Sequence, residues 1–147
     1  MRGMTIIVKN ISHLMIPSIF LLGVYVVVHG HLTPGGGFAG GVLIAGSFVL
    51  GILAYGSEEA KSLVKKWRAS LGESLGIFLF WFLAILGMVQ GTGFFYNMLA
   101  KTAPGQPGQL FSAGIIPLCN LAIGIEVAAA LFAIFITLAI LKVGEKL

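Results

Sequence analysis

Four apolar stretches, each long enough to cross a membrane as a helix, take up most of the sequence. They span residues 11–30, 38–55, 75–96 and 115–141. Because a helix rises about 1.5 Å per residue, about 20 residues cross a hydrocarbon core of about 30 Å. Of the 147 residues, 58% are hydrophobic and 10% are charged, whereas soluble domains carry about 25% charged residues. The pattern predicts one all-α domain over residues 1–147, an integral membrane protein with four transmembrane helices.

The segment 57–71 differs from its neighbours because apolar and basic residues recur there at helical spacing. One face collects Ala60, Leu63, Val64, Trp67 and Leu71, and the other collects Lys61, Lys65 and Arg68. A helix of this kind lies in the membrane interface instead of crossing the membrane. We therefore expect a short amphipathic helix over 57–71 that stops at Gly72, since glycine is typical of helix C-termini.

The basic residues predict the orientation of the chain. Eight of the nine Lys and Arg residues fall on one side of the predicted layout, and only Lys101 falls on the other. Positive charge concentrates on the cytoplasmic side, so both termini and the amphipathic segment are expected inside. This accounts for the net charge of +4 without nucleic acid, because eight of the nine basic residues lie beside predicted membrane segments. The single cysteine, Cys119, allows neither a disulfide nor a cysteine metal cluster within the chain.

The end of the third stretch is rich in glycine between residues 87 and 93, which predicts local unwinding. Gln90, Thr92 and Asn97 add polar side chains there, and we expect these three to hydrogen-bond to one another. The loop that follows carries proline and glycine over residues 103–108 and cannot continue a helix.

The first two stretches are joined by a glycine-rich segment, His29-Gly-His-Leu-Thr-Pro-Gly-Gly-Gly-Phe-Ala-Gly-Gly41. Its Pro34-Gly35 pair suits a turn with positive φ at the second central residue. Irregular backbone at membrane depth must be buried in protein or line a wet cavity. Two interpretations stay open: the backbone of 35–37 touches an ion or ordered water, or the glycines serve a tight turn and close helix packing. The second is favoured because glycine is enriched at contacts between membrane helices.

Glu126 is the only acid inside a predicted span, where a charge costs on the order of 3 kcal/mol. It needs water, a proton or a partner. Small residues share its helix face, which predicts that this face packs against another helix; they are Ala122, Ala129, Ala130, Ala133 and Thr137. We favour ion or proton handling by Glu126 over a purely structural hydrogen bond, because acids within membranes are functional by default.

His29 and His31 flank Gly30 at the end of the first stretch. Two positions apart, they lie on different faces of a helix and lack the i, i+4 spacing of metal ligands, and no other ligand cluster predicts a metal. Both are candidates for a proton path, His31 more than His29 because it belongs to the glycine-rich segment. Hydrogen bonding that fixes the loop is an equal alternative.

The segment resembles the signature of the MnhB (MrpB) family. The members of this family are the B subunits of Mrp-type multisubunit sodium/proton antiporters. The residues that match its Gly-His, Pro-Gly-Gly-Gly-Phe and Gly-Gly are Gly30-His31, Pro34-Gly35-Gly36-Gly37-Phe38 and Gly40-Gly41. The resemblance extends to the chain's size, to its four-helix layout and to Asn120 near the start of the last helix. Thr33 departs from the pattern, which often has Asn or Asp. Similar subunits occur in archaeal energy-converting membrane-bound hydrogenase and related sulfur-reducing complexes.

The resemblance implies a non-catalytic subunit of a prokaryotic cell membrane, without cofactors, that contributes to sodium and proton translocation. Its implied partners are other Mrp-like antiporter subunits, in some assemblies together with a hydrogenase module. The alternative is a purely structural scaffold in the same complex. A stand-alone transporter is disfavoured because the chain has no internal repeat, and an enzyme because it has no nucleophile with a base, metal cluster or phosphate loop.

Overall fold

The computed structural model describes residues 4–56, 66–89, 93–99 and 112–144. These residues form four helices and no strand, which confirms the predicted all-α class. The helices are α1 (Ile6–Val28), α2 (Gly36–Tyr55), α4 (Lys66–Val89) and α5 (Ile116–Gly144). Each contains a span long and apolar enough to cross a membrane, at Ile6–Val28, Gly36–Tyr55, Ser70–Val89 and Ile116–Ala139.

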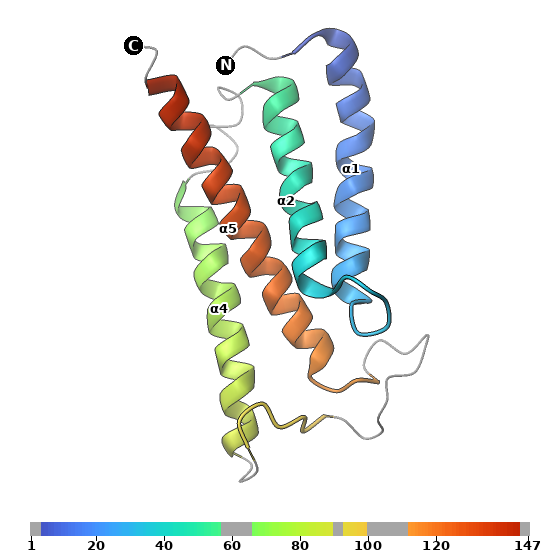
Figure 1. Ribbon diagram of the computed structural model, residues 1–147, viewed down its shortest axis with the longest axis vertical. Helices are drawn as coiled ribbons and strands as arrows, with labels where there is room; N and C mark the ends of the chain where they lie inside the picture. The colour runs from blue at the N-terminus through green and yellow to red at the C-terminus, as the bar shows by residue number, and fades with distance from the viewer. Residues whose placement is uncertain (1–3, 57–65, 90–92, 100–111, 145–147) are drawn as a thin grey trace.

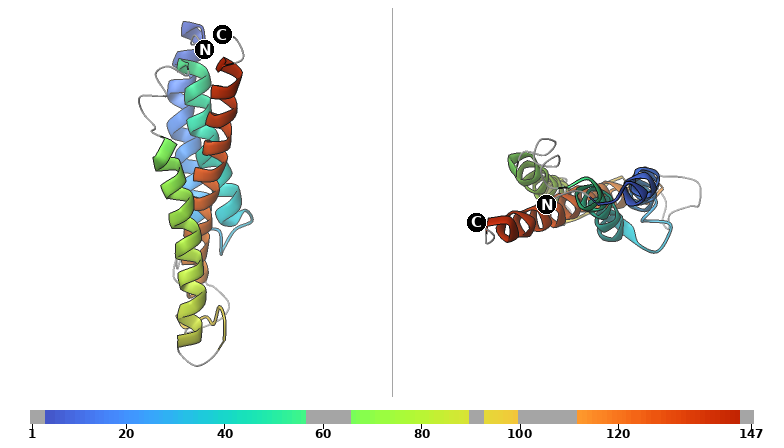
Figure 2. Two further views of the ribbon diagram at one scale, coloured as in Figure 1. Left: turned by 90° about the vertical axis from the view of Figure 1, so that its left-hand side faces the viewer. Right: turned by 90° about the horizontal axis from the view of Figure 1, so that it is seen from above.

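The helices stand in a row, in the order α1, α2, α5 and α4, and not in a closed bundle (Figures 1 and 2). The tilted α5 lies between α2 and α4 and contacts both. The beginning of α1 and the end of α5 lie on the same side of the molecule, at the top of Figure 1. We call the opposite end, where α1 is followed by α2, the motif end. The cytoplasmic location of the two termini stays a prediction.

Alanines share the buried helix contacts with a few larger residues such as Ile52 and Phe132, while many large apolar residues point outward. The buried positions include Ala45, Ala54, Ala84 and Ala122, whereas Leu14 is 71% exposed. In a soluble protein, large aliphatic side chains such as Leu14 are among the most often buried. Lipid or protein must cover the outer surface, since large exposed apolar patches mark membrane or protein contacts.

The third membrane helix starts and ends earlier than the predicted span 75–96. Residues 66–71 are the first turns of α4, and the rest of the predicted amphipathic helix 57–71 lies outside the described residues. Gly72 does not stop the helix, because it packs on α5: a Cβ at Gly72 would lie 3.0 Å from the Cβ of Ala129. A tertiary contact has overridden the local signal of a glycine.

At its other end, α4 stops at Val89, within the glycine-rich region predicted to unwind. The following chain folds back on the helix, and the Phe95 amide donates to the Ala84 carbonyl at 3.2 Å. The Tyr96 amide nitrogen lies 2.5 Å from the place that a Cβ of Gly87 would take. A side chain at residue 87 would prevent this return.

Asn97 ties that returning segment to the start of α5. Its amide nitrogen donates to the Ala113 carbonyl, and its amide oxygen accepts from the Ile115 backbone, both at 2.9 Å. The predicted hydrogen bonds to Gln90 and Thr92 fall on residues outside the described part. Asn97 has instead both ends of its amide committed to the backbone before α5.

Candidate functional site

The turn at the motif end depends on two glycines. Gly35 has a φ of 133° and Gly36 a φ of 70°, conformations that residues with a Cβ rarely adopt. On the side of α1, the His29 carbonyl accepts from the backbone amide of Thr33 at 3.0 Å and from its hydroxyl at 3.1 Å. Only seven residues, 29–35, thus separate the end of α1 from the start of α2.

The remaining glycines of the segment lie at helix contacts. A Cβ at Gly41 would lie 2.9 Å from the Gly124 carbonyl on α5, and one at Gly40 would lie 2.7 Å from the Gly23 carbonyl on α1. Gly37 touches the backbone carbonyl of Asn120. The first turns of α2 are therefore wedged between α1 and α5, with backbone against backbone on both sides.

Pro34 and Phe38, the other two residues of the Pro-Gly-Gly-Gly-Phe motif, point away from these contacts. Pro34 is exposed, and Phe38 is 64% exposed although it is a large apolar side chain. The glycines of the motif thus serve contacts within the chain, whereas its proline and phenylalanine lie on the outer surface.

The two histidines have different surroundings. His29 Nδ1 donates to the Tyr25 carbonyl at 3.1 Å, and its ring stacks on the Tyr25 ring with centroids 4.2 Å apart. Both ring nitrogens of His31 are buried without a hydrogen-bond partner. His29 is thus fixed at the end of α1, while His31 retains its full hydrogen-bonding capacity.

Asn120 joins His31 as an unsatisfied polar residue at the motif end. Its Nδ2 is buried without a partner, and together with the two nitrogens of His31 it completes the set of such side-chain atoms in the described part of the chain. The Asn120 side chain lies against Gly30 and Gly36. A buried polar group without a partner costs about 1–3 kcal/mol, so each of these nitrogens needs a partner from outside the described residues. From the sequence, Asn120 stood out only through the family resemblance.

Glu126 lies near the middle of the α5 span, where α5 crosses α4. A Cβ at Gly76 of α4 would lie 2.5 Å from the Glu126 Cβ and 2.7 Å from its backbone nitrogen. The helices therefore meet at Gly76, and Glu126 is held at their line of contact. Its side chain is half-buried, and its carboxylate has neither a hydrogen bond nor an ion pair with a described residue.

Part of the small-residue face predicted around Glu126 contacts α4 of the same chain. Ala129 packs on Gly72, one turn of α4 away from Gly76. The pair Gly72 and Gly76 has the four-residue spacing of close membrane helix contacts, which sequence reasoning missed because it took Gly72 as a helix stop.

Glu73 is a second acid on a membrane helix, so the prediction that Glu126 is the only one is wrong. It lies inside the span Ser70–Val89, whereas the predicted span began only at residue 75. Glu73 opens on a groove of about 320 Å³ between α4 and α5, whose other lining residues are Ala130, Ala133, Ile134, Thr137 and Leu138.

The candidate polar residues lie at separate places in the structure and do not form one cluster. Asn120 and Glu126 are six residues apart on α5, about 9 Å along its axis. Within the described residues, no group of three or more His, Cys, Asp or Glu side chains is placed to hold a metal.

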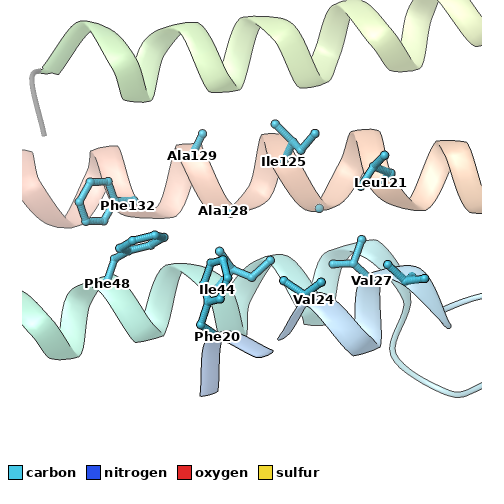
Figure 3. A pocket seen from close by; sticks show the side chains of 12 residues that line it. Phe20, Val24, Val27, Ile44, Phe48, Leu121, Ile125, Ala128, Ala129 and Phe132 are labelled. Carbon is cyan, nitrogen blue, oxygen red and sulfur yellow. The ribbon is translucent and has the colours of Figure 1, made fainter. Parts of the chain in front are cut away.

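A larger hollow lies between α1, α2 and α5 and is apolar. It has a volume of about 390 Å³, and Figure 3 shows phenylalanine, valine, leucine, isoleucine and alanine side chains around it, among them Phe20, Val24, Ile44, Phe48, Ile125 and Phe132. These side chains offer neither charge nor hydrogen bonds to an ion. The polar groups of the candidate site lie elsewhere, at the motif end and on the α4–α5 contact.

Several known proteins have sequences similar to that of this chain. The chain is 37% identical over 130 residues to the uncharacterized protein MJ1307 of Methanocaldococcus jannaschii, covering 86% of the chain and 49% of that protein. It is 34% identical over 59 residues to the putative antiporter subunit mnhB2 of Staphylococcus aureus strain Newman, covering 40% of the chain and 42% of that subunit. The chain thus spans about half the length of these curated relatives.

Among solved structures, the fold matches a chain of the membrane-bound sulfane sulfur reductase, an archaeal respiratory membrane complex. The TM-score is 0.73 at 31% sequence identity, over 88% of this chain and 56% of the other. A family model described as a domain related to the MnhB subunit of Na+/H+ antiporters matches residues 7–133. With its four membrane-spanning helices, the chain therefore belongs to the MnhB family of multi-pass membrane proteins.

Proposed function

We propose that the chain is a non-catalytic subunit of an Mrp-type sodium/proton antiporter module, stand-alone or within a membrane-bound respiratory complex, and that it contributes to ion translocation and to assembly. The proposal draws on the family and on the relatives that the chain matches. The observation that carries it is Glu126, an acid without a partner among the described residues, near the middle of a membrane span.

Position and surroundings support an ionic role for Glu126. A carboxylate kept only for structure would be expected to hydrogen-bond to a neighbouring helix, because an unpaired charge in the membrane costs several kcal/mol. The neighbouring helix instead offers Gly76, which has no side chain to pair with Glu126. The remaining partners for the carboxylate are a proton, a cation or a group from another subunit.

His31 is the second candidate for the path, together with Asn120. Three buried nitrogens without partners at the motif end are maintained at a cost in stability. A neutral imidazole accepts a proton at one nitrogen and donates one at the other, which suits a relay. His29 is a weaker candidate, since its Nδ1 is used by the Tyr25 carbonyl.

The scaffold alternative has an observation of its own. Gly37, Gly40 and Gly41 all lie at close helix contacts, and this part of the motif is explained by packing alone. The two functions separate when assembly and transport are measured independently on the same variants.

The deciding experiment is Glu126→Gln in the whole complex, produced with its partner subunits and assayed in everted vesicles. Glutamine keeps the size of the side chain, but its amide neither takes up nor releases a proton near neutral pH. We expect sodium/proton exchange to fall about 100-fold or more, the lower end of the contribution of a proton-transfer group, at unchanged assembly. Ser18→Ala is the control, because among the described residues the exposed Ser18 hydroxyl bonds only to Leu14 within its own helix. Unchanged exchange in Glu126→Gln at normal expression would remove the ionic role of Glu126 and leave the His31 path and the scaffold as the alternatives.

A further inference from the structure

A groove lies beside Glu73 between α4 and α5. Its lining on α5 comes from residues that follow Glu126 in the chain. Ala130, Ala133 and Thr137 lie four, seven and eleven residues after Glu126, so they share its face of the helix. Glu73 is half-buried and has neither a hydrogen bond nor an ion pair among the described residues. A carboxylate therefore faces a groove of about 320 Å³ without a counter-charge from the described part of the chain.

The lining of the groove does not suit a bare metal ion. Ala130, Ala133, Ile134 and Leu138 are aliphatic, and the Thr137 hydroxyl donates its hydrogen to the Ala133 carbonyl at 2.8 Å. The side-chain oxygens left are the two of Glu73 and the lone pairs of one hydroxyl. Hard cations such as calcium take about six to eight oxygen ligands, and this groove supplies about half of them.

A long basic side chain fits the groove better. Lysine and arginine bury an apolar stem along apolar surface and keep the charged head at a polar group. Here the stem would lie on the alanines and on Ile134, and the head would reach Glu73. The volume equals roughly ten water molecules at about 30 Å³ each, enough for one such side chain.

The small residues of the groove also suit the approach of a helix. On the same face of α5, Ala129 packs on Gly72 of α4. Ala130 and Ala133 are partly buried and line the groove, and Ile134 beside them is 57% exposed. Contacts between membrane helices are enriched in such small residues.

We propose that this groove receives a transmembrane helix of a neighbouring subunit, whose lysine or arginine side chain forms an ion pair with Glu73. The inference rests on the proposed function in one respect, that the chain is a subunit of a larger complex. It assigns the two membrane acids different roles: Glu73 holds a neighbour, and Glu126 handles the transported ion.

The first test is Glu73→Gln in the whole complex, with Ser74→Ala, the next residue on α4 and exposed, as the matched control. The retention of each subunit is measured by affinity purification through this chain and by native gels. We expect one neighbour to be lost about tenfold or more from Glu73→Gln, because a basic group would be left buried and unpaired. Exchange per remaining intact complex should stay at the level of the unsubstituted protein.

A second test identifies the occupant. Ile134→Cys, crosslinked in the native membrane, should capture a neighbouring subunit at a helix that carries lysine or arginine. Reversing both charges, with Glu73→Lys and an acid at that basic position, should restore retention. Leu14→Cys on the exposed face of α1 is the control for non-specific capture.

Each other outcome counts against the groove proposal. Full retention of every subunit in Glu73→Gln contradicts it, as does capture of a helix without a basic residue. Loss of a bound lipid at unchanged subunit composition identifies a headgroup as the occupant, and loss of exchange in intact complexes identifies an ion site. A chain that purifies without any partner contradicts the proposed function itself, which separates the two failures.

Discussion

A methyl group added at Gly76 has no room, because its carbon would lie 2.5, 2.7 and 2.8 Å from the Cβ, backbone nitrogen and Cα of Glu126. These are backbone and Cβ atoms, which cannot rotate out of the way. Gly76→Ala must therefore separate α4 from α5 by roughly 1 Å to reach ordinary carbon contacts of about 3.5–4.0 Å. Overpacking of this kind costs about 1–3 kcal/mol.

Gly46→Ala provides the matched comparison. Gly46 lies inside α2, and a Cβ there would meet nothing within 4 Å. Both substitutions replace a glycine inside a helix by alanine, which raises helix propensity by about 1 kcal/mol in each case. The difference between the two variants isolates the contact of Gly76 with Glu126, and we expect Gly76→Ala to be less stable than Gly46→Ala by about 1–3 kcal/mol.

The assay is unfolding of the purified complex in mixed detergent micelles, followed by helical circular dichroism as the denaturing detergent is increased. The exchange activity per complex is measured on the same preparations, because moving α4 also displaces the helix contact that holds Glu126. Equal unfolding midpoints for Gly76→Ala and Gly46→Ala would refute the close approach of α4 to α5 at this point.

Three further variants test other contacts. His31→Leu should lower exchange while leaving the yield unchanged or higher, because it removes two buried nitrogens that have no partner; a fall in both yield and exchange would show that His31 is structural. His29→Leu should lower stability by about 1 kcal/mol through loss of the bond to Tyr25, and a stability equal to the parent in detergent unfolding would contradict that bond. Asn97→Ala should cost about 1–3 kcal/mol, since the Ile115 amide and the Ala113 carbonyl lose their partners; unchanged hydrogen exchange at the Ile115 amide would argue against this.

Much of the fold follows from composition and hydropathy. An apolar stretch of about 20 residues has few alternatives to a transmembrane helix, so the number and order of the spans were predictable. The bounds of α4 were not, because Gly72 is a stop signal by itself and a packing residue beside Ala129. Whether a glycine ends a helix or packs within it depends on the neighbour it meets.

The candidate site was predictable where it depends on local chemistry. The positive φ of Gly35 follows from the Pro-Gly sequence, and the unusual position of Glu126 follows from its apolar neighbours. The surroundings of Asn120 and Glu73 could not be predicted, because they depend on how the helices pack and where α4 begins. Asn120 gains its place from the glycines opposite it, and Glu73 from the start of α4 before residue 70.

The proposed action of Glu126 on the transported ion is tested most directly by exchange through the purified Glu126→Gln complex in proteoliposomes. Sodium-driven proton movement is measured per intact complex, with subunit composition checked on the same sample. We expect a complete complex whose exchange is reduced about 100-fold or more. A complete Glu126→Gln complex that exchanges at the rate of the unsubstituted protein would contradict it.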